Sequence, residues 1–156
     1  MVSATVSPPW TYTLQLPQDP RAPGVARSTL RTVLRVHGMS ELIEIAELLA
    51  CELVTNAYLH SSGPYSLRMR DAGRSRVRLS VWDTDPHIPA PFRWSAEAPA
   101  ELAERGRGLY LVTLYAESWG AYPMRGALPG QGGKLLWVEC AAKGDGGAGD
   151  RGAGRA

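Results

Sequence analysis

The alternation of side-chain character over residues 76–83 constrains the fold of this chain more than any other feature. Up to residue 81 the odd positions are valine or leucine, and the even positions carry arginine, serine or tryptophan. Successive side chains of a β-strand point to opposite faces, so this pattern predicts a strand with one buried face. Residues 65–70 predict a second strand, joined to the first by a hairpin at residues 71–73. The apolar face of the hairpin must meet helices.

A helical pattern over residues 40–59 supplies one such helix. Its apolar residues follow the spacing of a buried stripe: Leu42, Ile45, Ala46, Leu49 and Leu53. We expect Ser40 to cap the start of this helix, and the Ser-Ser-Gly-Pro cluster at residues 61–64 to end it. Two further helices are predicted at residues 25–36 and 109–116, and three further strands at residues 10–16, 119–123 and 134–140.

The composition excludes several classes of protein. Of the 156 residues, 44% are hydrophobic, which fits a folded domain rather than a disordered chain. The net charge of +2 gives no general case for direct binding to nucleic acid or to a membrane surface. No apolar run is long enough to span a bilayer, and the N-terminus has no signal-peptide pattern. Because Cys51 and Cys140 lack a metal-binding spacing, we expect buried thiols in a reducing cytoplasm.

The chain divides into three parts. We expect one domain over residues 10–142, a flexible arm at residues 1–9, and a disordered tail at residues 143–156, where Gly, Ala, Asp and Arg dominate. Within the domain, residues 84–105 hold four prolines and show little periodicity before residue 98. A loop of this length inside a compact domain is usually functional or mobile, so we expect it to act as a lid.

One face of the helix at residues 40–59 carries polar groups in a regular row. Glu52, Asn56 and His60 are four residues apart and therefore share this face. A carboxylate and a carboxamide so placed can hold a hydrated cation and polarise a hydroxyl group or water. An ordinary solvated helix face is the alternative for Glu52 and Asn56, and we interpret His60 as a residue of the helix end.

Asp83 ends its strand on the apolar side, where the helices must pack. Burying a carboxylate is costly unless it accepts hydrogen bonds. A ligand with an exocyclic amine would satisfy Asp83, and so would a backbone group at the strand end. Farther along, Gly106-Arg107-Gly108 precedes a predicted helix. Glycines before a helix let backbone N–H groups approach a phosphate, and the helix N-terminus favours negative charge.

The order of these parts resembles the GHKL ATPases, a superfamily that includes gyrase, histidine kinases and the MutL repair proteins. The resemblance rests on three segments, which are similar to the N box and the two glycine boxes of that superfamily: Glu52-Leu53-Val54-Thr55-Asn56-Ala57, Val81-Trp82-Asp83-Thr84-Asp85-Pro86 and Gly106-Arg107-Gly108-Leu109-Tyr110-Leu111-Val112. It covers roughly residues 11–140 and is most similar to the anti-sigma-factor serine kinases, in particular the actinobacterial ATP-binding proteins. It implies an α+β fold: the two-layer α/β sandwich called the Bergerat fold, with a mixed, mainly antiparallel sheet and helices on one face.

The resemblance also implies a role for each matching residue. Glu52 would be the general base that activates the acceptor hydroxyl, and Asn56 would ligate the Mg²⁺ that bridges the phosphates of ATP. Asp83 would accept the adenine amine. The phosphate cradle would comprise Gly106, Arg107, Gly108 and Leu109. Lys134, at the start of the last predicted strand, would be a polar residue near the base.

One segment departs from the pattern of the superfamily. Glycines usually follow the aspartate of the first glycine box, whereas Asp85 and Pro86 follow Asp83-Thr84 here. An Asp-Pro pair stiffens this turn and adds negative charge close to the expected nucleotide.

The function implied is that of an ATP-binding anti-sigma-factor-like regulator in the cytoplasm. Such a protein is a serine/threonine protein kinase that phosphorylates a STAS-type anti-anti-sigma antagonist and sequesters a sigma factor, and proteins of this class commonly form homodimers. The alternative is a nucleotide-gated protein-binding module without kinase activity. A detached histidine kinase domain is a third reading, which the lack of a preceding phosphoacceptor helix disfavours. The arginines at residues 68–78 would bind an acidic partner or form a solvated sheet face.

Overall fold

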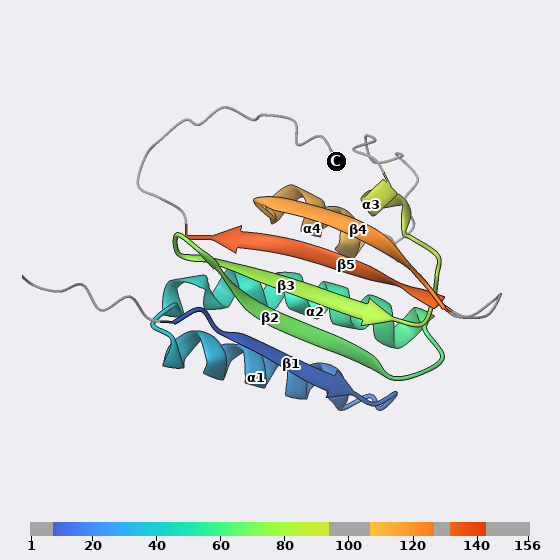
Figure 1. Cartoon of the computed structure of the whole chain (residues 1–156), viewed down its shortest axis with the longest axis horizontal. Helices are drawn as coiled ribbons and strands as arrows, with labels where there is room; N and C mark the ends of the chain where they lie inside the picture. Colours follow the sequence, from blue (N-terminus) through green and yellow to red (C-terminus); the bar gives the residue numbers. More distant parts are fainter. Residues whose placement is uncertain (1–7, 94–106, 127–131, 143–156) are drawn as a thin grey trace, which may run out of the picture.

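The computed structural model describes residues 8–93, 107–126 and 132–142 (Figure 1). The N-terminal half contains β1 (Thr11–Leu16), α1 (Ala22–Val36), the 3₁₀ turn η1 (Ser40–Leu42), α2 (Ile43–His60), β2 (Tyr65–Gly73) and β3 (Arg76–Asp83). The rest contains α3 (Ala90–Arg93), α4 (Arg107–Tyr115), β4 (Ser118–Arg125) and β5 (Gly132–Ala141). Trp94 to Gly106, which include most of the expected lid, lie outside the described residues, as do the tail and most of the arm.

The strands form one sheet in the order β1-β2-β3-β5-β4. All four pairings between these described strands are antiparallel. The expected two-layer α+β sandwich is therefore confirmed, but its sheet is antiparallel rather than mixed. Antiparallel neighbours need no crossover helix, so the helices are free to gather on one side.

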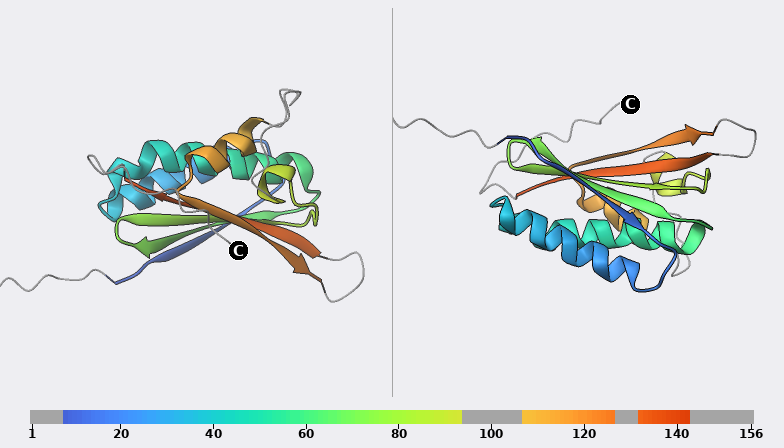
Figure 2. Two further views of the ribbon diagram at one scale, coloured as in Figure 1. Left: turned by 90° about the horizontal axis from the view of Figure 1, so that it is seen from above. Right: turned by 60° about the horizontal axis from the view of Figure 1, so that its bottom comes forward.

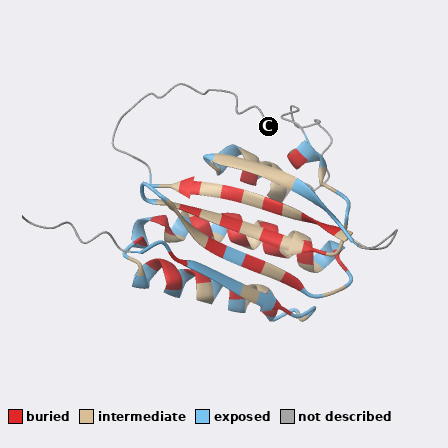
Figure 3. Cartoon of the chain, viewed as in Figure 1, coloured by how far each residue is buried: buried red, intermediate tan, exposed pale blue. Residues whose placement is uncertain are grey.

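Helices α1, α2 and α4 cover one face of the sheet, as the two rotated views show (Figure 2). The inner face of β3 carries Val77, Leu79 and Val81, each at most 1% exposed. Buried and less buried residues alternate along β3 and β5, which gives the banded strands of Figure 3. The alternation in the sequence thus identified the correct inner face. Successive side chains of a strand point to opposite faces of the sheet, and only the apolar set is buried here.

The helices begin at other residues than the sequence patterns indicated. Ser40 does not cap α2: it opens the 3₁₀ turn η1, and α2 starts at Ile43 without a side-chain cap. A 3₁₀ turn before an α-helix satisfies backbone groups through tighter hydrogen bonds, here from Leu42 N to the Met39 carbonyl at 3.0 Å. Helix α1 starts at Ala22, three residues earlier than predicted, because Pro23 suits the first turn of a helix.

The β2–β3 hairpin turns later than predicted. Residues 71–73 belong to β2 and form an irregularity in its register with β3. The chain reverses at Arg74 and Ser75, whose φ angles are 52° and 57°. Positive φ at both central residues is the geometry of a two-residue hairpin turn, which usually selects asparagine or glycine. The Asp-Ala-Gly sequence was therefore a misleading turn signal.

The outer face of the sheet carries the arginines of β3. Arg78 forms an ion pair with Glu139 at 2.8 Å and places its guanidinium 4.0 Å from the ring centre of Trp137. Arg76 Nε donates a hydrogen bond to Glu117 Oε2 at 3.1 Å. Both arginines are thus paired with glutamates of the same chain, which favours the solvated-face interpretation for this part of the arginine cluster.

Candidate functional site

Glu52 of α2 meets Gly108 of the predicted glycine box at the start of α4. Gly108 is the second residue of α4, and a Cβ atom built on it would lie 2.8 Å from Cδ of Glu52 and would collide with Oε2. The Glu52 carboxylate therefore rests directly against the backbone of the glycine box. The partial positive charge of a helix N-terminus stabilises a carboxylate in this position. The two segments are 56 residues apart in the chain, and the fold brings them into contact.

Asn56 lies one turn after Glu52 on α2. Its side-chain Oδ1 is buried and has no hydrogen-bond partner in the described part of the chain. A buried acceptor left unpaired costs about 1–3 kcal/mol, so such an atom calls for a partner. An amide oxygen is a ligand that Mg²⁺ accepts, and this orphaned atom fits the role predicted for Asn56.

Asp83 lies at the end of β3 on the helix side of the sheet, as its parity predicted. Only 1% of its surface is exposed. The strand-end backbone group considered above is present, because Asp85 N donates to Asp83 Oδ1 at 2.9 Å. The amine that contacts Asp83 comes from the chain itself: Lys134 Nζ lies 3.0 Å from Oδ1 and 2.9 Å from Oδ2. Burial raises the pKa of Asp83 above its ordinary value, although the Lys134 ammonium and the Asp85 N–H oppose that rise.

Lys134 was predicted only as a polar residue near the base, and not as the partner of Asp83. It lies within β5 and pairs across the sheet with Asp83. Its side chain is 1% exposed, and Nζ also lies 3.3 Å from the Asp85 carbonyl. Only the strand order, in which β5 follows β3, makes these two residues neighbours. In the sequence, only the short glycine run before Lys134 indicated that this segment comes close to another part of the backbone.

Gly133 explains how β5 can approach so closely. A Cβ atom at this residue would lie 2.9 Å from the carbonyl carbon of Asp83 and would collide with the carbonyl oxygen. A larger residue would force β5 away from the end of β3. The absence of a side chain at Gly133 therefore allows Lys134 to reach Asp83.

The Asp85-Pro86 turn is held by its own hydrogen bonds. Asp85 Oδ1 accepts from His87 N at 3.0 Å, and Oδ2 lies 3.6 Å from Lys134 Nζ. The extra negative charge expected near the nucleotide is thus partly balanced by Lys134. The turn leads to α3, where Phe92 is buried and packs edge-on against Trp119 with ring centres 5.4 Å apart.

The rest of the predicted cradle is only partly described. Gly106 and the Arg107 side chain lie outside the described residues, although the backbone of Arg107 begins α4. Leu109 is partly buried and packs against the core. His60 is exposed at the end of α2, whereas Glu52 and Asn56 are half-buried.

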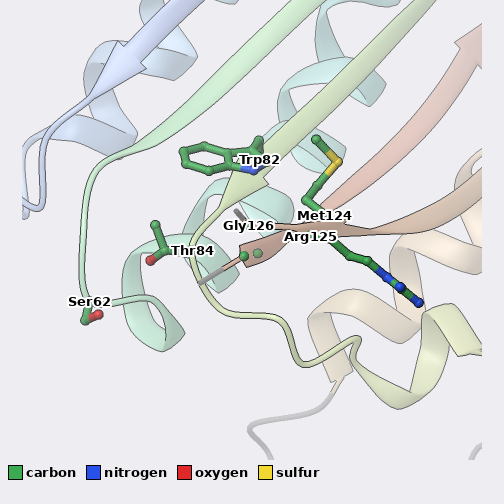
Figure 4. Close-up of a pocket in the computed structure, with 8 residues that line it drawn as sticks. Ser62, Trp82, Thr84, Met124, Arg125 and Gly126 are labelled. Carbon is green, nitrogen blue, oxygen red and sulfur yellow. The ribbon is translucent and has the colours of Figure 1, made fainter. Parts of the chain in front are cut away.

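A hollow of about 660 Å³ lies beside this region (Figure 4). It is lined by Ser62, Trp82, Thr84, Met124, Arg125, Gly126, Gly132 and Gly133. Trp82 belongs to the outer parity of β3, whereas Asp83 belongs to the inner one. None of the predicted site residues lines the hollow, so we do not assign the nucleotide to it.

Residues 16–126 match the family of histidine kinase-like ATPase domains, which is more than half of the 156 residues. The chain belongs to this family. No curated protein matches it closely enough to count as a relative. As a histidine kinase-like ATPase domain, the chain is an ATP-binding domain of the GHKL type. The matched segment includes Glu52, Asn56, Asp83 and the glycine box, but it ends before β5 and Lys134.

The described residues lack both a membrane-spanning helix and a cluster of metal ligands. No helix there is long and apolar enough to cross a membrane. The same residues contain no group of three or more His, Cys, Asp or Glu side chains that could hold a metal ion. Both cysteines are free thiols; Cys140 is buried, as expected, whereas Cys51 is only half-buried.

Proposed function

We propose that this histidine kinase-like ATPase domain is a serine/threonine protein kinase that regulates transcription as an anti-sigma-factor-like protein. The observation that carries the proposal is the contact of Glu52 with Gly108 at the start of α4, beside the orphaned oxygen of Asn56. A carboxylate, a cation ligand and a helix N-terminus are the groups that phosphoryl transfer needs in one place.

In this proposal each residue has one task. Mg²⁺, when bound to ATP, neutralises the charge of the phosphates, and Asn56 Oδ1 would hold it. Backbone N–H groups at the start of α4 would bind phosphate oxygens. Glu52 would then accept the proton of the attacking serine hydroxyl, and Asp83 would accept a hydrogen bond from the exocyclic amine of adenine. Catalysis would consist mainly of positioning and charge stabilisation.

The proposed partners follow from the resemblance to anti-sigma-factor kinases. The protein substrate would be a STAS-type anti-anti-sigma protein, and the sequestered partner a sigma factor of RNA polymerase. We propose that the protein acts in the cytoplasm, which the two free thiols support, and that it forms a homodimer. Phosphorylation of the antagonist would keep the sigma factor bound.

A nucleotide-gated binding module without kinase activity is the second candidate. The position of Glu52 favours it, because the carboxylate lies against the backbone at the start of α4, the place where the phosphates would bind. In such a protein, ATP would change the affinity for the partner without being consumed.

Calorimetric titration with ATP and Mg²⁺ tests the nucleotide site. Asn56→Ala should lose Mg²⁺-dependent binding while the fold survives, and Asp83→Asn should weaken ATP more than tripolyphosphate. Glu44→Ala, which removes an exposed carboxylate from the first turn of α2, is the matched control and should bind as the wild type does. Unchanged ATP binding by Asn56→Ala would disprove the assignment of Asn56.

Phosphate transfer to a STAS-type protein then separates the two candidates. Glu52→Ala should keep ATP binding and lose transfer, because the proton acceptor is gone. Transfer undiminished in Glu52→Ala would remove Glu52 as the base. A wild-type protein that binds ATP and its partner, yet transfers no phosphate, would establish the binding module instead.

A further inference from the structure

The buried cluster around Asp83 contains three charged groups. The Lys134 ammonium contacts both oxygens of Asp83, the carbonyl of Asp85 and, at 3.6 Å, the Asp85 carboxylate. Asp83 and Lys134 are each 1% exposed, whereas the Asp85 side chain retains 25% exposure. Lys134 is therefore the only described cation that contacts the two carboxylates.

No other charged group in the described residues replaces Lys134 beside Asp83. From β2, Tyr65 precedes Ser66, the residue that pairs with Trp82. The Tyr65 hydroxyl is buried without a partner among the described residues, and burial raises its pKa. From α2, the nearest acidic residue of the predicted site, Glu52, rests against Gly108 instead. From the following loop, Asp85 adds a negative charge that disfavours ionisation of Asp83.

The hydrogen bonds of Asp83 leave one place open. A carboxylate offers about four lone-pair positions, two on each oxygen. Oδ1 accepts from both Lys134 Nζ and Asp85 N, whereas Oδ2 contacts only Lys134 Nζ among the described residues. Oδ2 therefore retains one position for an external donor such as an exocyclic amine.

We propose that Lys134 is a positioning residue for base recognition: it keeps Asp83 ionised in its buried place and orients Oδ2 toward the amine of the nucleobase. This inference rests on the proposed ATP binding. A protonated Asp83 would present a donor in place of one acceptor and would hold the base less well. Lys134 thus acts on the nucleotide only through Asp83.

The proposal predicts a change in pH dependence. Burial already raises the pKa of Asp83, and loss of Lys134 would raise this pKa further. The ionised form exists above the pKa, so base-dependent affinity is present at high pH and is lost as the pH falls through the pKa of Asp83. In Lys134→Met this loss should begin at a higher pH than in the wild type.

The test is the affinity for Mg²⁺-ATP between about pH 5.5 and 9, measured by calorimetry. Lys134→Met should bind more weakly than the wild type at the acid end of this range and should approach the wild type near pH 9. Below both pKa values, the loss should approach about tenfold for each unit by which the pKa of Asp83 rises. Lys134→Arg should keep the wild-type profile because it retains the charge. Tripolyphosphate affinity should not change, because that ligand has no base.

Each outcome has a defined meaning. Failure of the wild type to bind ATP would overturn the proposed function. Normal ATP binding by the wild type, with the same pH profile in Lys134→Met, would overturn only the role of Lys134. Should Lys134→Met fail to fold, as circular dichroism at each pH would show, the double variant Asp83→Asn, Lys134→Met decides. It buries no charge, so its affinity should be independent of pH, and a wild-type profile in it would overturn the proposal.

Discussion

At the scale of single residues, Gly108 and Glu52 form a contact that no side chain at residue 108 would permit. Gly108→Ala should displace the carboxylate, which is the far end of a flexible side chain. The fold should therefore survive, with a gain of up to about 1 kcal/mol from the better helix propensity of alanine. Phosphate transfer should fall at least about tenfold, because Glu52 leaves its place. Urea unfolding and transfer kinetics measure the two effects.

Gly24→Ala is the matched control for that prediction. Gly24 also lies in a helix, α1, but a Cβ atom there would meet nothing within 4 Å. This substitution should stabilise the protein by a similar amount and leave transfer unchanged. Equal transfer by both alanine variants would show that the contact between Gly108 and Glu52 does not matter for the reaction.

The sequence predicted some site residues and not others for a physical reason. The side on which Asp83 lies follows from the alternation of its own strand, which is local information. Its ion pair with Lys134, 51 positions later, depends on which strands become neighbours. The roles of Glu52, Asn56 and Asp83 came from their resemblance to a known family and stay predictions.

At the scale of elements, the β2–β3 turn carries a cost that one substitution should remove. Ser75 has a φ of 57°, a conformation that glycine adopts without steric penalty. Ser75→Gly should raise the free energy of unfolding by about 0.5–1 kcal/mol, since the left-handed conformation costs other L-residues roughly that much or more. Chemical denaturation measures the change.

Ala72→Gly provides the comparison within the same hairpin. Ala72 lies in β2 and its φ is not positive, so glycine there adds freedom to the unfolded chain without relieving any strain. This variant should be less stable than the wild type. A loss of stability in Ser75→Gly as well would mean that the turn is not strained.

Whole elements were easier to predict than their ends. Every helix and strand expected within the described residues is present, because apolar periodicity over many residues reports burial. Their ends depend on the backbone hydrogen bonds of one or two residues, as the 3₁₀ turn before α2 shows. The Arg74-Ser75 turn lacks the usual asparagine or glycine, so the residue types predicted the turn at residues 71–73 instead.

At the scale of the whole molecule, β5 comes last among the strands but lies between β3 and β4. Its inner face contributes Leu136, Val138 and Cys140 to the core. Deletion of residues 127–156 should therefore abolish cooperative thermal unfolding, because it exposes an edge of β3 and leaves β4 without a partner. Circular dichroism during heating measures this.

Deletion of residues 143–156 is the corresponding control, because it retains all of β5. Its unfolding transition should match that of the full chain. Retained cooperative unfolding after the larger deletion would show that β1, β2 and β3 form a stable sheet with the helices by themselves. The two-layer arrangement was predictable from the one-sided strands, whereas the order of the strands required long-range pairing that the sequence pattern does not encode.

The position of β5 also determines when the sheet can be completed during synthesis of the chain. As the chain leaves the ribosome, β4 emerges before β5 and has no strand to pair with. Until Lys134 emerges, Asp83 has no counter-charge, so the nascent chain cannot hold that carboxylate buried in its charged form. The carboxylate proposed to bind the base is therefore held in place only after β5 has joined the sheet, so ATP would stabilise the fold only from that point.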